Sequence, residues 1–74
     1  MFTEKDYFAA ARELRADPMN TFLLGYSVGT GHPCILIDRD SVLCEFPSLP
    51  KGMELAVEVC KLLNRDSHIE AMEQ

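Results

Sequence analysis

The sequence contains no long apolar run, and basic residues are scarce in it. No segment approaches the roughly 18 consecutive apolar residues that a membrane-spanning helix needs, so we expect no membrane contact. The first residues, Met1 to Asp6, lack a basic region followed by an apolar core, and we expect no secretory signal. Seven Lys and Arg residues stand against twelve Asp and Glu, which gives a net charge of −5. Because nucleic-acid-binding surfaces are usually basic, direct binding of nucleic acid is not expected.

Cysteine is present but lacks the spacing of a metal site or a disulfide framework. Cys34, Cys44 and Cys60 are an odd number of thiols at wide spacing. Zinc sites commonly use close cysteine pairs, and this chain has none. The pattern is typical of a cytosolic protein with reduced thiols, so we expect a cytoplasmic location and no metal or cofactor.

The residues that are present have the composition of one folded domain. Hydrophobic residues make up 47% and charged residues 26% of the 74 residues, a mixture typical of globular proteins. A chain of this length is too short to divide into several domains. We predict a single small domain over residues 1–66. Residues 67–74 are expected to form a short tail that either frays or adds one helical turn.

The N-terminal segment predicts a helix over residues 4–15. Thr3 is a good N-cap, and Asp6 lies three residues later, in the position of a capping box. The pair Asp17-Pro18 ends the helix, because the residue before proline disfavours helical backbone.

The remaining chain predicts three strands and a second helix. Apolar residues recur at strand spacing over Thr21–Val28, Cys34–Ile37 and Val42–Phe46. Residues 50–64 begin with proline and repeat apolar side chains at helical spacing. The order predicts a small two-layer α+β fold, α-β-β-β-α, in which two helices pack on a three-stranded antiparallel meander.

The expected register follows from matching the apolar faces of the strands. It places Val28 opposite Ile35. In the next pair it places Cys44 opposite Ile35, and Val42 opposite Ile37. The connector between these strands lacks Asn-Gly or Asp-Gly, so we expect a loop built on a type I turn.

This register leaves apolar side chains on the face of the sheet away from the helices. The residues expected to face water there are Leu23, Cys34, Leu36 and Leu43. The apolar arc of the second helix is also wider than one sheet needs. Exposed apolar patches usually mark interaction surfaces, so we expect a non-enzymatic protein-interaction module, most simply a homodimer. The alternative is a three-layer monomer in which the first helix covers this face. The predicted contact residues are Leu23, Leu36, Leu43, Leu55, Val59 and Leu62.

A second hypothesis uses the acidity of the chain. Asp38, Asp40 and Glu45 could contact a basic partner, as in a small acidic phage-type inhibitor that acts as an anti-defence protein or a nucleic-acid mimic. A short hairpin that leads into an apolar helix ending Leu62-Leu63-Asn64 resembles many small phage- and plasmid-type proteins in style. The resemblance rests on no diagnostic motif and assigns no functional residue.

The hypothesis that the protein is an enzyme has little support in the sequence. His32 and Cys34 could form a base and a nucleophile, but no orienting acid is identifiable beside them. The glycines of Gly29-Thr30-Gly31 lead into a strand, whereas phosphate-binding glycine loops lead into a helix. We therefore expect no catalytic residues. If an enzyme or thiol sensor existed here, Cys34 and His32 would be its candidates.

Overall fold

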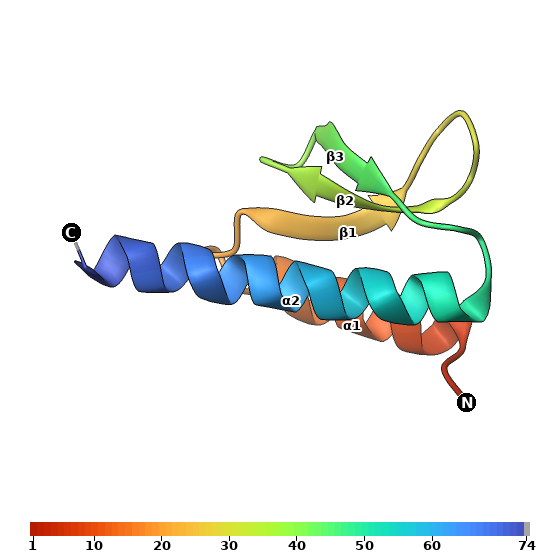
Figure 1. Cartoon of the computed structure of the whole chain (residues 1–74), viewed down its shortest axis with the longest axis horizontal. Coiled ribbons are helices and arrows are strands. Elements are labelled where there is room, and N and C mark those ends of the chain that lie inside the picture. The colour runs from red at the N-terminus through yellow and green to blue at the C-terminus, as the bar shows by residue number, and fades with distance from the viewer. Residues whose placement is uncertain (74) are drawn as a thin grey trace.

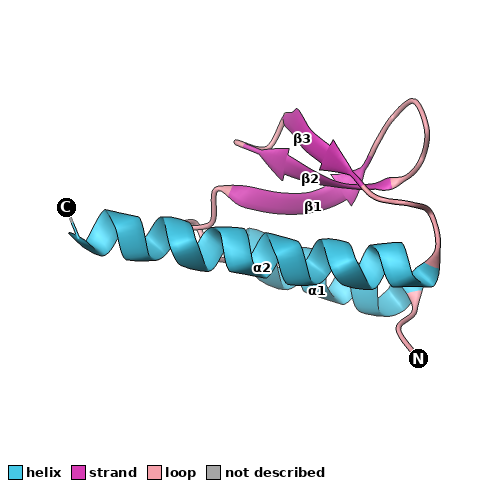
Figure 2. Ribbon diagram, in the orientation of Figure 1, coloured by secondary structure: helices cyan, strands magenta, loops and turns pink. Residues whose placement is uncertain are grey.

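The computed structural model describes the backbone of residues 1–73 and the side chains of residues 1–69. The elements in chain order are α1 (Glu4–Ala16), β1 (Phe22–Tyr26), β2 (Pro33–Ile37), β3 (Ser41–Glu45) and α2 (Pro50–Glu73). The strands form one antiparallel sheet in the order β1-β2-β3. The predicted α+β fold, two helices with a three-stranded meander, is therefore confirmed (Figure 2).

The two helices lie side by side and run in the same direction, with the sheet on one side of the pair (Figure 1). They are parallel because three strands, an odd number, return the chain to the end at which α1 began. α1 packs on β1, whereas α2 contacts both β1 and β2. Within residues 1–73, neither helix packs on β3. The third strand is thus held mainly by its pairing with β2, without helix contacts.

The core lies between the helix pair and the first two strands. Leu24 and Ile35 pair across β1 and β2, and both are almost fully buried. The helices contribute buried side chains at helical spacing on their facing sides: Tyr7, Ala10 and Leu14 from α1, and Ala56, Val57 and Cys60 from α2. Burial of these apolar side chains is the main favourable contribution to folding.

The start of α1 has the predicted capping box. The Asp6 amide donates to Thr3 Oγ1 at 3.3 Å, and the Thr3 amide donates to Asp6 Oδ2 at 2.9 Å. The hydrogen bond from the Thr3 amide stabilises the carboxylate and lowers the pKa of Asp6. Asp17 is extended before Pro18, as expected, and the helix ends one residue later than predicted, at Ala16.

The register between β1 and β2 differs from the prediction. Leu24, rather than Val28, lies opposite Ile35, and Val28 is fully exposed beyond the strand. The reason is a turn that begins two residues earlier than predicted: the last strand pair is Tyr26 with Pro33, and the Ser27 amide donates to the carbonyl of His32 at 2.9 Å. Gly31 closes this loop with a φ of 73°, which glycine adopts at little cost.

The register between β2 and β3 is partly as predicted. Cys44 lies opposite Ile35, but Val42 lies opposite Leu36 instead of Ile37, because the register shifts between Ile35 and Leu36. The shift leaves Leu43 as an extra residue on β3, as in a β-bulge.

The connecting turn was also predicted wrongly. Asp38 and Arg39 both have positive φ, 53° and 78°, which is the pattern of a primed hairpin turn rather than type I.

Two exposure predictions on the sheet are wrong. Leu23 and Cys34 are buried, at 2% and 0% exposure, although we expected them to face water. Gly25 lies opposite Cys34. A Cβ atom at Gly25 would lie 3.1 Å from the Leu36 side chain, so Leu36 occupies the space that this glycine leaves free. The predicted register, with Cys44 opposite Ile35, placed Cys44 on the helix side of the sheet. It is nevertheless exposed, because neither helix contacts β3 within residues 1–73.

The second helix is longer than predicted. It continues past Asn64 to Glu73 and includes most of the expected tail over 67–74, of which residue 74 lies outside the described residues. His68 Nε2 lies 3.1 Å from the carbonyl of Met19 and ties this extension to the loop after α1. None of the helices described here has the length and apolar character needed to cross a membrane.

Candidate interaction surface

An exposed apolar stripe runs along α2. Leu55, Leu62 and Ile69 are 47%, 51% and 48% exposed, and they are spaced seven residues apart. At about 100° per residue, seven residues return to within roughly 20° of the same direction, so the three side chains form one row. Val59 is half-buried, and it lies in the same row between Leu55 and Leu62. We call these four residues the α2 stripe.

The stripe is bordered by charges in an ordered sequence. Glu58 and Arg65 each lie three residues after a stripe leucine, about 60° around the helix from it. Glu54 precedes Glu58 by one turn, and Lys61 precedes Arg65 by one turn, and all four are exposed. The first half of this border is therefore acidic and the second half is basic. Asp66 is exposed between Leu62 and Ile69 and is the one charge within the stripe over the described residues.

A groove adjoins the first turn of the stripe. It has a volume of about 440 Å³ and is formed by the loop before α2 and the start of that helix. Leu49 and Leu55 both line it, and Leu49 is 65% exposed. The groove extends the apolar surface beyond the helix and could receive an apolar side chain.

The six predicted contact residues do not form one surface. Leu55 and Leu62 are exposed on the α2 stripe, and Val59 lies beside them. Leu43 is exposed in the β3 bulge, on a strand that neither helix contacts within residues 1–73. Leu36 is half-buried and packs against the core, and Leu23 is buried, so these two offer little surface to a partner.

Ile69 is the stripe residue that the sequence prediction missed. The second helix was expected to end at Asn64, so a residue five positions further was not considered. The signal was nevertheless present in the sequence, as a seven-residue repeat of large aliphatic side chains at Leu55, Leu62 and Ile69.

The predicted acidic contact is divided between two ends of β3. Asp38 and Asp40 flank Arg39 in the turn that precedes the strand, and Glu45 is its last residue. Glu45 Oε1 accepts a hydrogen bond from the Thr30 hydroxyl at 3.3 Å. The three carboxylates therefore do not form one continuous acidic surface.

The thiol candidate has the wrong environment for reactivity. Burial, followed by the charge of Glu45, raises the pKa of Cys34, and a reactive cysteine needs the opposite shift. The amide of His32 donates to the Thr30 hydroxyl at 3.2 Å. Among the residues described, no three His, Cys, Asp or Glu side chains are placed to hold a metal ion.

The comparisons with known proteins add no relative to this picture. No protein-family model, curated protein or solved structure matches the chain.

Proposed function

We propose that the protein is a non-enzymatic interaction module that self-associates through the α2 stripe, in an antiparallel pairing with α2 of a second copy. The observation that carries the proposal is the row of three half-exposed aliphatic side chains at seven-residue spacing. Such a row is the arrangement with which helices pair along a shared apolar seam. Three free thiols support a reducing, cytoplasmic setting for the pair.

The order of charges beside the stripe favours the antiparallel direction. In a two-fold dimer, the same patch meets itself in reverse. With the axis near Leu62, Ile69 of one copy lies beside Leu55 of the other, close to the groove at Leu49. Residue 58 of one copy then lies at the level of residues 65 and 66 of the other, so Glu58 has Arg65 of the second copy beside it on the border and Asp66 of that copy within the seam. In a parallel pairing, the acidic half of the border would lie beside the acidic half of the second copy, and the two basic halves would also lie together.

The energetics predict a reversible dimer. Burying each half-exposed aliphatic side chain contributes roughly 2 kcal/mol at about 25 cal/mol per Å². Six such side chains, three per copy, are opposed by an association cost of about 4 to 15 kcal/mol. We therefore expect the dimer population to depend on concentration.

The first test is Leu62→Glu, measured by sedimentation equilibrium over a wide concentration range. A charge at the centre of the seam should shift the protein to monomer, with an unchanged unfolding midpoint at low concentration. Leu43→Glu is the matched control, because Leu43 is equally exposed but lies on β3. Wild-type protein that is monomeric throughout, or a dimer lost in the Leu43 variant alone, would contradict the proposal.

The second test exchanges the bordering charges. Glu58→Arg alone places two arginines together across the dimer, and Arg65→Glu alone places two glutamates together. Each should weaken self-association, whereas the double variant restores opposite charges and should recover it. A double variant no tighter than either single variant would exclude this pairing.

The acidic-inhibitor hypothesis has less support. Its three carboxylates lie at two ends of β3, and one of them already accepts a hydrogen bond from Thr30. The direct test is a salt-sensitive complex with a basic partner that is lost when Asp38, Asp40 and Glu45 are neutralised together.

A further inference from the structure

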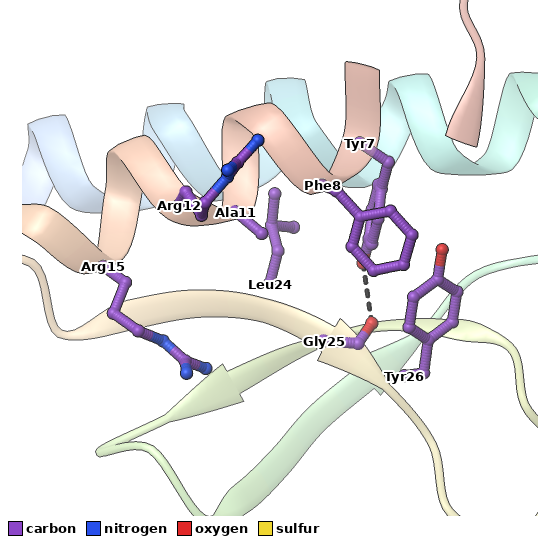
Figure 3. A pocket seen from close by; sticks show the side chains of 8 residues that line it. All are labelled: Tyr7, Phe8, Ala11, Arg12, Arg15, Leu24, Gly25 and Tyr26. Carbon is purple, nitrogen blue, oxygen red and sulfur yellow. Dashed lines mark hydrogen bonds between the residues drawn. The ribbon is translucent and has the colours of Figure 1, made fainter. Parts of the chain in front are cut away.

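A second hollow lies between α1 and β1, apart from the α2 stripe. It is open to solvent and has a volume of about 470 Å³, within the range of small-molecule sites. Figure 3 shows the side chains of Ala11 and Leu24 near its middle, with aromatic rings at one end and two arginines at the other. The hollow therefore has an apolar middle and two chemically different ends.

The aromatic end is built before any ligand arrives. Tyr7 and Tyr26 have ring centroids 5.2 Å apart, tilted by 55°, and Phe8 lies 5.8 Å from Tyr26 at 54°. The Tyr7 hydroxyl donates to the carbonyl of Gly25 at 2.7 Å, which fixes that ring against the sheet (Figure 3). Phe8 is 49% exposed, so one ring of this group still offers much of its surface.

The other end carries positive charge in an acidic protein. Arg12 and Arg15 are exposed, lie three residues apart on α1 and line the same hollow. Residues three apart are neighbours on a helix surface. Figure 3 shows Arg15 extending toward the sheet and Arg12 extending along α1, so a change of side-chain rotamer is needed for one anionic group to contact both guanidinium groups. Glu4 lies one turn before Phe8 on α1, at the aromatic end of the hollow, and burial followed by its charge raises the pKa of Tyr26. A ligand anion would therefore be repelled from the rings and attracted to the arginines.

We propose that this hollow binds an aryl carboxylate, with the ring of the ligand against Phe8 and Tyr26 and its carboxylate on Arg12 and Arg15. Tilted ring pairs of this kind are a favourable geometry for a further aromatic ring. Guanidinium groups bind carboxylates through charge-assisted and often bidentate hydrogen bonds. The ligand source is either a free aromatic acid or a peptide that ends in an aromatic residue, because both present the same two groups.

The test is a titration of isotope-labelled protein followed by amide NMR shifts. The probes are 3-phenylpropanoate, the neutral alcohol 3-phenylpropanol, and the peptide Gly-Gly-Phe with a free carboxylate. We expect the acid to shift the amides of Ala11, Gly25 and Tyr26 and to bind at least tenfold more tightly than the alcohol. Binding of the free acid, with or without the peptide, assigns a small-molecule ligand, and binding of the peptide alone assigns a peptide C-terminus. Equal affinity for acid and alcohol, or shifts centred on Leu49 and Leu55, would overturn the proposal.

Variants separate the two ends of the hollow. The double change Arg12→Gln and Arg15→Gln should weaken acid binding by about tenfold or more and leave alcohol binding unchanged. Phe8→Ala should weaken both ligands. The charge-matched control is Arg39→Gln with Lys51→Gln, which removes two cations outside the hollow and should have little effect. An arginine double variant that binds the acid like wild type would contradict the proposal. Leu62→Glu should bind like wild type, so a failure of self-association does not affect this result.

Discussion

Asn64 joins α2 to the outer edge of β1 through both ends of its amide group. Its Nδ2 donates to the carbonyl of Phe22 at 2.8 Å, and its Oδ1 accepts from the Phe22 amide at 2.9 Å. Asn64 is the buried polar side chain of the core, at 4% exposure. Because β1 is an edge strand, these backbone groups have no partner strand on that side. One side chain thus replaces the hydrogen bonds of a missing neighbour strand.

Replacing Asn64 should therefore cost more than its size suggests. Asn64→Ala removes two hydrogen bonds, leaves the Phe22 amide unsatisfied, and leaves the Phe22 carbonyl with the Cys60 thiol as its donor at 3.3 Å. We therefore expect a loss of about 2 to 4 kcal/mol in the free energy of unfolding. Urea denaturation measures it. Lys61→Ala, an exposed site one turn earlier, should change stability by less than about 0.5 kcal/mol. An Asn64 variant as stable as the Lys61 variant would show that water replaces the amide.

For single residues, the sequence predicts features that depend on residues nearby in the chain. It fails for side-chain burial, which depends on residues far away in the chain. The Thr3 capping box is local, spanning three residues, and it was predicted correctly. The burial of Cys34 and the exposure of Cys44 were predicted in reverse. For Cys44 the reason is that neither helix contacts β3 within residues 1–73. Nothing in the sequence around Asn64 indicated that its partner is Phe22, 42 residues away.

Among the elements, α2 begins with a contact that only glycine permits. A Cβ atom at Gly52 would overlap the carbonyl oxygen of Pro47, a backbone atom that cannot rotate away. The loop before α2 is thereby folded closely over the first turn of the helix, where Gly52 is buried.

Gly52→Ala should destabilise the protein although alanine is the better helix former. The helix propensity gain is about 1 kcal/mol, but the overlap requires the loop or the helix start to move. We expect a net loss of at least about 1 kcal/mol in thermal or urea unfolding. Gly29→Ala is the control, because a Cβ there meets nothing within 4 Å, and its effect should be close to zero. A stabilised Gly52 variant would contradict the described loop conformation.

The order and type of all five elements were predictable because each has its own periodicity or breaker. Strand register was less predictable. Ile35 lies opposite Cys44 as predicted, but Val42 lies opposite Leu36 instead of Ile37, because the register shifts between Ile35 and Leu36. A bulge changes the face of every following residue, and no local signal located it. The end of α2 was placed too early because residues 65–69 have weaker apolar periodicity than residues 53–63.

Across the whole molecule, side-chain burial decreases from the helix pair outward to β3, whose five residues are all exposed. This gradient predicts how the three thiols respond to iodoacetamide at pH 8. Cys44 is exposed and should react fastest of the three. Burial raises the pKa of Cys60 to about 11 and also raises the pKa of Cys34, and both side chains are fully buried, so thiolate formation and access of the reagent are both disfavoured at these sites. These two should react only through unfolding.

Quenched samples analysed by mass spectrometry would show one fast modification and two slow ones. Cys44→Ser should abolish the fast phase alone, and urea should accelerate the slow phases together. Labelling of Cys34 as fast as that of Cys44 would mean that β2 opens without global unfolding.

The candidate sites were predictable to different degrees. The α2 stripe could be read in part from Leu55, Val59 and Leu62, because helical spacing alone places them together. The hollow beside Arg12 and Arg15 could not be predicted, because it forms where α1 crosses β1. Its aromatic residues come from two elements, α1 and β1, and no local sequence pattern indicates that they meet.

The parallel direction of α1 and α2 has a mechanical consequence. Met1 and the far end of α2 lie at opposite ends of the long dimension of the molecule (Figure 1). A pulling force between them would act along the helix axes, so the helix contacts would be loaded in shear and many would have to yield at once. A force that pulls β3 (residues 41–45) away from β2 would instead break the hydrogen bonds between these strands one at a time. The fold should therefore resist a force applied to the two ends of the chain, whereas a weaker force should be enough to detach β3.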